Sequence, residues 1–216
     1  MRGDLVDEWN YSEIVKDHFM NPRNVLSVPE EEFEADGIGF VGSPACGDMM
    51  KVWIKVDNDR IVDFKWKTYG CASAIGSTSM LSEMVLENGG VKLEDAYEIT
   101  PEQIMARLGG LPHHKIHCSV LGDKALQEAI NNYYENTGQE NKINRKRGVI
   151  VCKCLDVTDY DIEEAVMEET FTWEDLQERT KVATGCGECK DEARALFVQY
   201  LEKYYPQEAK KLKFES

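Results

Sequence analysis

Alternating apolar and polar residues predict a β-hairpin in the first half of the chain. In DMMKVWIKV (48–56), methionine, valine and isoleucine alternate with lysine and tryptophan. RIVDFKWKTY (60–69) alternates in the same way, and DND (57–59) between them is a typical turn sequence. A period of two is that of a strand with one face toward a core. EADGIGFVG (34–42) is the expected third strand.

Helical periodicity on both sides of these strands predicts helices that pack on the sheet. The expected helices cover residues 11–20, 71–88 and 118–135. TPEQ (100–103) begins another, because threonine and glutamine at this spacing form a capping box and proline favours the first helical position. The first half is therefore expected to be α+β, an antiparallel three-stranded sheet packed by helices.

The pattern after residue 148 predicts a small, mostly helical domain. Thr158 with Asp161, and Thr172 with Asp175, resemble helix caps ahead of apolar-periodic runs. CGECKDEARALFVQYLEKYY (186–205) carries apolar residues at helical spacing. We expect this helix to begin at its first cysteine.

The distribution of charge predicts two domains joined by a linker. The net charge is −15, from 25 basic and 40 acidic side chains. QENKINRKRG, by contrast, holds four basic residues and one acidic residue between two acidic parts of the chain. The expected boundaries are a first domain at 1–137, a linker at 138–148, a second domain at 149–205 and a tail at 206–216.

Composition also excludes several classes of partner. An acidic surface is a poor match for nucleic acid or for anionic membranes. No apolar run approaches the about 20 residues that cross a bilayer. The first ten residues, MRGDLVDEWN, lack the apolar core of a secretory signal. We therefore expect a cytoplasmic protein with neither a nucleic-acid nor a membrane partner.

Seven cysteines make metal or thiol chemistry the leading hypothesis. An odd number in an intracellular chain argues against a disulfide framework. Three lie before the linker and four after it. They are Cys46, Cys71, Cys118, Cys152, Cys154, Cys186 and Cys189.

The last four cysteines have the pattern C-x-C, 31 intervening residues, C-x-x-C. Four thiolates can hold a tetrahedral zinc ion or an iron–sulfur cluster. A helix that starts near Cys186 and Cys189 offers N–H groups to negative sulfur, and Gly185 and Gly187 let the backbone come close. These features favour a [2Fe–2S] cluster, with zinc as the alternative.

The first three cysteines each lie where a loop meets a helix or strand. Cys46 stands in the loop GSPACGD with Asp48, Cys71 follows a strand and begins a helix, and His117 and Cys118 begin the last helix. Together they offer more ligands than one metal ion needs, and the carboxylate and imidazole bind more reversibly than thiolates. A thiol at a helix N-terminus is also the more reactive one, so Cys118 is the candidate nucleophile.

These segments resemble a known family. GSPACGDMM, KTYGCASAIGSTS and KIHCSVL are similar to the three ligand-bearing segments of the NifU/IscU iron–sulfur scaffold family, and the similarity extends over residues 10–135. Residues 149–205 resemble the [2Fe–2S] domain of NifU, which is of the type found in bacterioferritin-associated ferredoxin (BFD-like). The resemblance implies an IscU/NifU-like fold followed by a BFD-like domain.

The resemblance implies an assembly scaffold rather than an enzyme. A cysteine desulfurase (NifS- or IscS-like) would deliver persulfide sulfur, a transient [2Fe–2S] cluster would form with iron, and apo iron–sulfur proteins would receive it. Cys118 would be the persulfide acceptor. Iron or zinc would bind at the first site, on Cys46, Asp48, Cys71 and Cys118. His117 would be a further ligand of the transient cluster at this site. A permanent [2Fe–2S] cluster would be held by Cys152, Cys154, Cys186 and Cys189. Whether the chain acts as a homodimer stays open.

The main alternative is a zinc-dependent, SufU-like sulfurtransferase that relays persulfide sulfur. SufU proteins hold zinc at the same cysteines and aspartate, typically carry an insertion before the third cysteine, and lack the neighbouring histidine. Here 46 residues separate Cys71 from Cys118, and His117 is present, so both features favour the scaffold. A second alternative is an electron-transfer or regulatory protein that acts through its second domain. The ligand set of the first site speaks against it.

Overall fold

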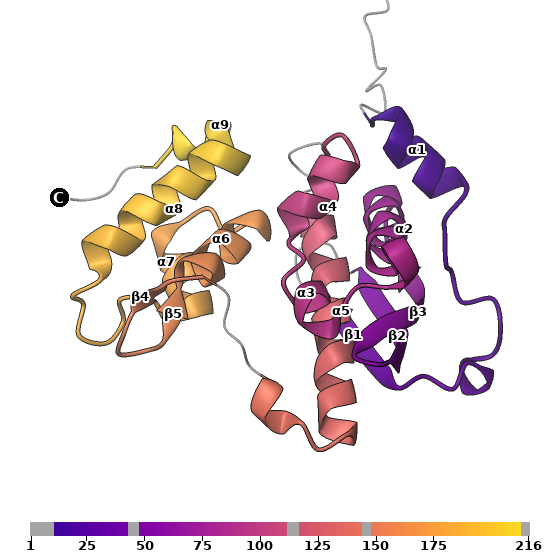
Figure 1. Ribbon diagram of the computed structural model, residues 1–216. Helices are drawn as coiled ribbons and strands as arrows, with labels where there is room; N and C mark the ends of the chain where they lie inside the picture. The colour runs from indigo at the N-terminus through magenta and orange to yellow at the C-terminus, as the bar shows by residue number, and fades with distance from the viewer. Residues whose placement is uncertain (1–10, 43–47, 112–116, 144–147, 213–216) are drawn as a thin grey trace, which may run out of the picture. The chain divides into compact units, whose positions relative to one another are not determined.

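The computed structural model of the chain describes residues 11–42, 48–111, 117–143 and 148–212 (Figure 1). The chain divides into two compact units, Met1–Gly138 and Gln139–Ser216. Among the described helices, none combines the length and the apolar composition that a membrane crossing requires.

The first unit contains a three-stranded antiparallel sheet in the order β1-β2-β3. The strands are β1 (Gly37–Gly42), β2 (Met49–Asp57) and β3 (Arg60–Tyr69). Asn58 and Asp59 turn the chain between β2 and β3 with φ angles of 49° and 59°. Asparagine and aspartate tolerate this left-handed conformation, which a tight hairpin requires. The predicted hairpin is therefore confirmed.

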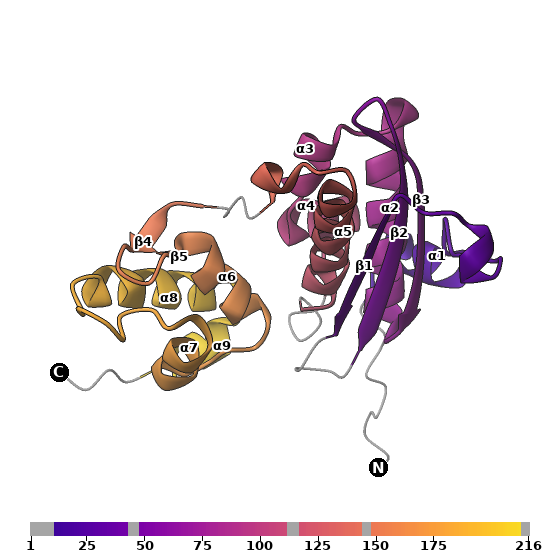
Figure 2. The same ribbon diagram turned by 90° about the horizontal axis from the view of Figure 1, so that it is seen from below.

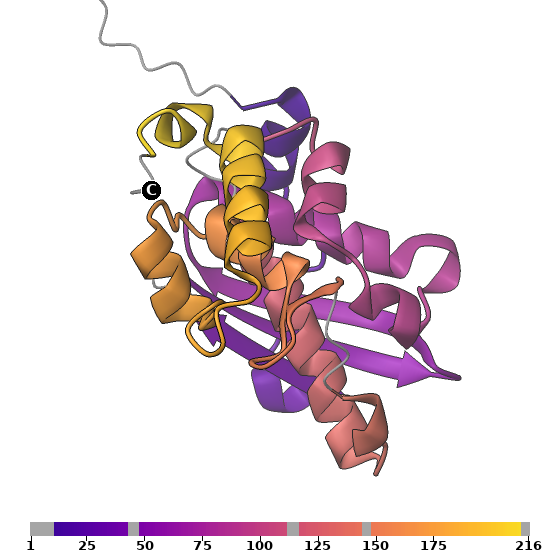
Figure 3. The same ribbon diagram turned by 90° about the vertical axis from the view of Figure 1, so that its left-hand side faces the viewer.

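Five α-helices complete the part of the first unit that the structure describes. They are α1 (Glu13–Met20), α2 (Ala72–Leu86), α3 (Leu93–Tyr97), α4 (Pro101–Arg107) and α5 (His117–Asn136). Figure 2 shows α2 and α5 along the same face of the sheet, and Figure 3 shows α5 lying over the strands. The strand residues beneath these helices are buried; they include Met50, Val52, Ile54, Phe64 and Trp66. The α+β architecture predicted for this unit is confirmed.

Two glycines of β1 allow α5 to lie directly on the sheet. A Cβ atom at Gly39 would lie 2.0 Å from the carbonyl oxygen of Ala125, and one at Gly37 would lie 2.2 Å from that of Ala129. Any larger residue at either position would push the helix backbone away. The backbone of β1 therefore packs directly on the backbone of α5, whereas elsewhere in the core side chains lie between the helices and the sheet.

The boundaries of β1 and α2 differ from those predicted. β1 starts at Gly37 and not at residue 34, because a 3-10 turn, η1 (Glu30–Glu32), precedes it and Glu34 has a φ of 49°, outside the strand region. α2 begins after Cys71, which is its N-cap. It ends at Leu86, because Asn88, with a φ of 53°, interrupts the helix inside the 3-10 turn η2 (Glu87–Gly89). The short helix α3 was not predicted.

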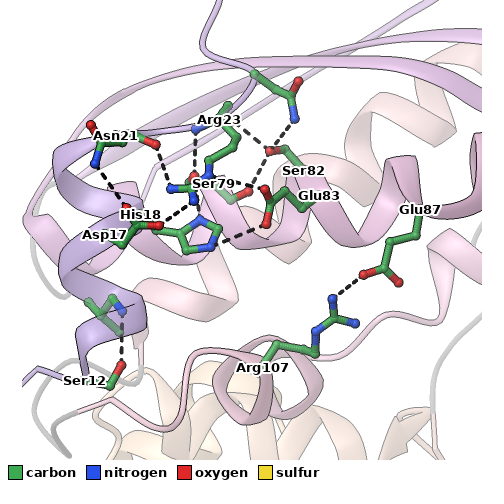
Figure 4. A network of polar contacts seen from close by, with 12 residues as sticks. Ser12, Asp17, His18, Asn21, Arg23, Ser79, Ser82, Glu83, Glu87 and Arg107 are labelled. Atoms are coloured by element: carbon green, nitrogen blue, oxygen red, sulfur yellow. Dashed lines mark hydrogen bonds and ion pairs between the residues drawn. The ribbon is translucent and has the colours of Figure 1, made fainter.

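A polar network around the buried side chains of His18 and Ser79 joins α1 to α2 (Figure 4). The Ser79 hydroxyl accepts a hydrogen bond from the Arg23 N–H at 2.9 Å, and it lies 2.8 Å from Nδ1 of His18. The Arg23 side chain pairs with Glu83, Nε to Oε1 at 3.3 Å, and with Asp17. Because Ser79 already accepts from Arg23, its own proton is available to a neutral His18 ring.

Burial lowers the pKa of His18 below its ordinary 6.5, and the positive charge of Arg23 adds to this, while Glu83 and Asp17 act in the opposite direction. The imidazole is only 3% exposed. The folded chain therefore favours the neutral ring.

Acid should weaken the first unit through His18. Between the lowered pKa in the folded state and the ordinary value of 6.5, the unfolded chain binds more protons than the folded chain. This contribution to stability is therefore complete above about pH 6.5 and is lost as the pH falls below it. We expect the free energy of unfolding to drop more between pH 7.5 and pH 5.5 in the wild type than in His18→Gln, which cannot ionise. The free energy is measured from amide hydrogen exchange in α1 and α2. If it drops equally in the wild type and in His18→Gln, His18 does not have this role.

The second unit is small and mostly helical, as predicted. It contains a two-stranded antiparallel sheet and four α-helices among its described residues, and a 3-10 turn, η4 (Glu140–Lys142), precedes them. The elements are β4 (Ile150–Cys152), β5 (Val157–Thr158), α6 (Asp159–Met167), α7 (Trp173–Thr180), α8 (Lys190–Tyr204) and α9 (Pro206–Ala209). Its core is formed by Ile162, Val166, Trp173, Leu176, Phe197 and Leu201. The small sheet was not predicted.

The two helix caps predicted for this unit are confirmed, but one helix starts later than predicted. Thr158 forms a capping box with Asp161, and the Thr172 side chain accepts a hydrogen bond from the N–H of Asp175. The helix expected to begin at Cys186, however, begins only at Lys190. The reason is Gly187, whose φ of 77° lies in the left-handed region and cannot continue a helix.

Candidate metal centres

The second unit gathers its four cysteines from two separate stretches of chain. Cys152 ends β4, Cys154 lies in the following turn, Cys186 lies in the loop before α8, and Cys189 is the N-cap of α8. The Sγ atoms of Cys152 and Cys154 are 3.7 Å apart, and those of Cys154 and Cys186 are 3.5 Å apart. Cys189 is hydrogen-bonded to Cys152. The C-x-C and C-x-x-C pairs therefore meet.

The four thiols differ in their surroundings. Cys152 and Cys189 are buried, whereas Cys154 and Cys186 are exposed. Burial raises the pKa of Cys152, but hydrogen bonds from the backbone N–H groups of Ala183 and Leu155, together with those of the Cys189 and Cys154 thiols, hold this pKa below its ordinary value.

The pKa of Cys189 is raised by burial and by the neighbouring Cys152. For Cys154, a hydrogen bond from the Cys186 backbone lowers the pKa, but the thiols of Cys186 and Cys152 outweigh it and leave the pKa above its ordinary value. Among Cys152, Cys154 and Cys189, only Cys152 has surroundings that favour the thiolate.

The loop before α8 approaches the sulfur atoms with its backbone. A Cβ atom at Gly185 would lie 3.0 Å from Sγ of Cys154, and Gly187 has the left-handed conformation described above. Bare N–H groups near thiolates stabilise negative charge, which a cluster with four thiolate ligands carries. The donor set thus fits a [2Fe–2S] cluster, and it equally fits tetrahedral zinc.

The exposed pair, Cys154 and Cys186, forms the solvent-facing side of this cysteine group, and the buried pair, Cys152 and Cys189, forms its inner side.

The close approach at Gly185 gives a direct test of this site. One added methyl group in a packed site costs about 1–3 kcal/mol, so Gly185→Ala should weaken metal binding by roughly tenfold. The measurement is competition with a chelator for cobalt, read from the absorption of the tetrathiolate complex. Gly138→Asn, away from the four cysteines, is the control, because nothing lies within 4 Å of a Cβ there and asparagine tolerates the left-handed backbone of this residue. If Gly185→Ala binds cobalt as tightly as the wild type and the control, the loop does not shape the site.

The first unit brings Asp48 and Cys71 together at one end of the hairpin. Met49 of β2 lies opposite Tyr69 of β3, so the residues just beyond them are neighbours. Oδ2 of Asp48 accepts a hydrogen bond from the N–H of Cys71 at 3.2 Å. Asp48 is 8% exposed, which is little for a carboxylate.

Gly70 makes this approach possible. A Cβ atom at Gly70 would lie 2.9 Å from both Cγ and Oδ2 of Asp48. Sequence reasoning did not single out Gly70. The available signal was a glycine directly before a cysteine at a strand end, and its meaning depends on a carboxylate that lies 22 positions earlier in the sequence.

The electrostatics of α2 explain why a carboxylate lies there. The N-cap residue, Cys71, makes no side-chain capping hydrogen bond, and the first turn of α2 contains no acidic residue. A helix N-terminus carries partial positive charge and unsatisfied N–H groups. Asp48, directly before β2, supplies the acceptor and the negative charge that the helix itself lacks.

The remaining residues of the predicted first site are only partly described. Cys46 lies outside the described residues, and so do the side chains of His117 and Cys118, although these two residues begin α5. That all five residues form one site therefore stays a prediction.

Four convergent thiols in the second unit, and a thiol with a carboxylate at a helix start in the first, are typical of a metal-binding protein. The sequence matches the NifU-like N terminal domain over residues 10–140 and the BFD-like [2Fe-2S] binding domain over residues 150–199. The chain therefore belongs to the NifU-like family, with a BFD-like domain after the first. The resemblance seen in the sequence is confirmed.

Similar proteins include scaffolds and nitrogen-fixation proteins. The chain is 39% identical over 186 residues to the nitrogen fixation protein NifU of Azotobacter chroococcum, a match that covers 85% of this chain and 57% of that protein. It is 47% identical over 133 residues to the iron-sulfur cluster assembly scaffold protein IscU 1 of Archaeoglobus fulgidus, covering 62% of this chain and 82% of that protein. The chain thus spans little more than half the length of its NifU relative.

Proposed function

We propose that this chain is a scaffold on which iron–sulfur clusters are assembled and from which they are transferred. The observation that carries the proposal is the meeting of Asp48 and Cys71, a hard and a soft ligand at one helix start. A mixed shell binds iron less permanently than the all-sulfur shell of the second unit. Relatives named as NifU and as IscU scaffolds support the same role.

Sulfur would arrive as a persulfide from a NifS- or IscS-like cysteine desulfurase. Cys118 would accept it, because thiolates attack the outer sulfur and a helix N-terminus favours the thiolate. Iron would be held by Cys46, Cys71 and Cys118, with Asp48 as the weakly bound ligand and His117 as a further ligand. Apo iron–sulfur proteins would then receive the finished cluster, so the chain is a carrier and not an enzyme.

The electron balance of assembly gives the second unit a role. Each persulfide sulfur needs two electrons to become sulfide, so two sulfides need four. Two ferrous ions supply half of these electrons when they become ferric, and a one-electron donor must supply the rest. A [2Fe–2S] cluster on Cys152, Cys154, Cys186 and Cys189 provides one-electron chemistry when bound. The two exposed thiols, Cys154 and Cys186, would lie on the side of this cluster through which electrons enter and leave.

Metal analysis tests the scaffold proposal. After anaerobic reconstitution, we expect two classes of iron and acid-labile sulfide, one removed quickly by a chelator and one retained. Cys71→Ala should abolish the labile class alone, because it removes a thiol of the first site. Cys154→Ala should abolish the retained class alone, and whether clusters then still assemble at the first site tests the electron-supply role. Zinc in the first site that iron and sulfide cannot displace would instead favour the SufU-like sulfurtransferase, whose donor set is the same.

Asp48 should control how fast the first site releases its cargo. Without the carboxylate, a chain with Asp48→Ala should retain its cluster several-fold longer and transfer it to an apo-ferredoxin more slowly, since the weakest bond in the shell is gone. Transfer is followed by the circular dichroism of the acceptor. Asp57→Ala, an exposed carboxylate at the opposite end of β2, is the control. If the wild type, Asp48→Ala and Asp57→Ala all transfer the cluster at the same rate, Asp48 is not a labile ligand.

A further inference from the structure

The Asp48 carboxylate has a hydrogen-bond partner in the backbone of the first unit. It accepts the hydrogen bond from the Cys71 N–H at 3.2 Å, and it is the acceptor that α2 lacks on its own N-cap side chain. An iron atom at the first site would compete for the same carboxylate. The N–H group and the iron therefore offer two alternative partners to one side chain.

The hairpin and Gly70 keep both partners within reach. The opposed residues Met49 and Tyr69 fix the backbone next to Asp48. A Cβ atom at residue 70 would lie 2.9 Å from Cγ and Oδ2 of Asp48 and 3.1 Å from Cβ of Ala74. Only a glycine therefore leaves room for the carboxylate where it bonds to the Cys71 N–H, and rotation of the Asp48 side chain would direct the same carboxylate to iron.

We propose that Gly70 is a positioning residue that lets Asp48 exchange between the N–H of Cys71 and iron in the first site. The inference rests on the proposed scaffold function. On release, the iron–oxygen bond breaks and the N–H···O hydrogen bond forms. The carboxylate stays ionised, and no electron or proton moves. The N–H of Cys71 thus offers a hydrogen bond to the Asp48 carboxylate when it leaves iron, which lowers the barrier to release of the cluster.

Gly70→Ala should prevent the hydrogen bond between Asp48 and the Cys71 N–H. The backbone of Gly70 is not in the left-handed region, so alanine is allowed there and only its methyl group matters. In the metal-free protein with Gly70→Ala, we expect the Cys71 amide to exchange its hydrogen about tenfold faster, because a capping interaction is lost. In the loaded protein, cluster transfer should be roughly threefold to tenfold slower for the same reason.

The matched control is Gly76→Ala, on the same helix. A Cβ there would lie 3.4 Å from Cγ1 of Val15 and 3.6 Å from its carbonyl oxygen, which are ordinary contacts. This variant should leave both the Cys71 amide and the transfer rate as in the wild type. If Gly70→Ala transfers its cluster at the control rate although its Cys71 amide exchanges faster, the proposal is wrong.

A double-mutant cycle separates positioning from a general structural effect. If Gly70 acts through Asp48, then Gly70→Ala should change nothing further in a chain that already carries Asp48→Ala. An additional loss of similar size in that background would overturn the proposal. A wild-type chain that forms no labile cluster at all would instead refute the scaffold function itself, a distinct result.

Asp48→Asn keeps the test valid if Gly70→Ala does not fold. Asparagine retains the oxygen that accepts from the Cys71 N–H, but its neutral amide is a much poorer iron ligand than a carboxylate. The Cys71 amide of this variant should stay as protected as in the wild type, while its cluster is retained longer. Loss of that protection would show that the Asp48 side chain does not hold the Cys71 N–H as described.

Discussion

The antiparallel register of β2 and β3 is the constraint on which the first site depends. It places Met49 opposite Tyr69, and so brings Asp48 beside Cys71. A slip of one residue would turn every side chain of one strand to the other face. The register is held far from the site, because Val52 and Trp66, and likewise Ile54 and Phe64, are opposed pairs buried beneath the helices. The hydrophobic core of the first unit is therefore what fixes its ligand geometry.

The two candidate centres differ in ways that match different lifetimes of a bound cluster. In the second unit four thiols surround one place, and backbone N–H groups, such as that of Ala183, support them. In the first unit the carboxylate of Asp48 is a weaker ligand for iron than a thiolate, and it has a hydrogen-bond partner at the start of α2. A site with such a ligand is easier to empty than one whose ligands are all thiolates.

Local patterns in the sequence predicted most of the fold. The hairpin and the caps at Thr100 and Thr158 depend on residues only a few positions apart, so the sequence reveals them. The start of α8 was misjudged because apolar spacing extends through Gly187, whose backbone conformation the spacing does not record. Ligand types and spacings also identified the candidate sites. The role of Gly70 could not be predicted, because it consists of an absent Cβ beside a residue from another strand.

The position of Cys71 links metal binding to the stability of α2. This cysteine is the N-cap of a helix that is held on one side by the sheet and α5, and on the other by α1 through His18, Ser79 and Arg23. A ligand that binds only the ordered helix start stabilises the fold by its binding energy, and an interaction that orders the helix start strengthens binding in return. The polar network between α1 and α2 begins two helical turns from Cys71, at Ser79. In the proposed scaffold, its contribution to folding would therefore also be a contribution to holding iron at the first site.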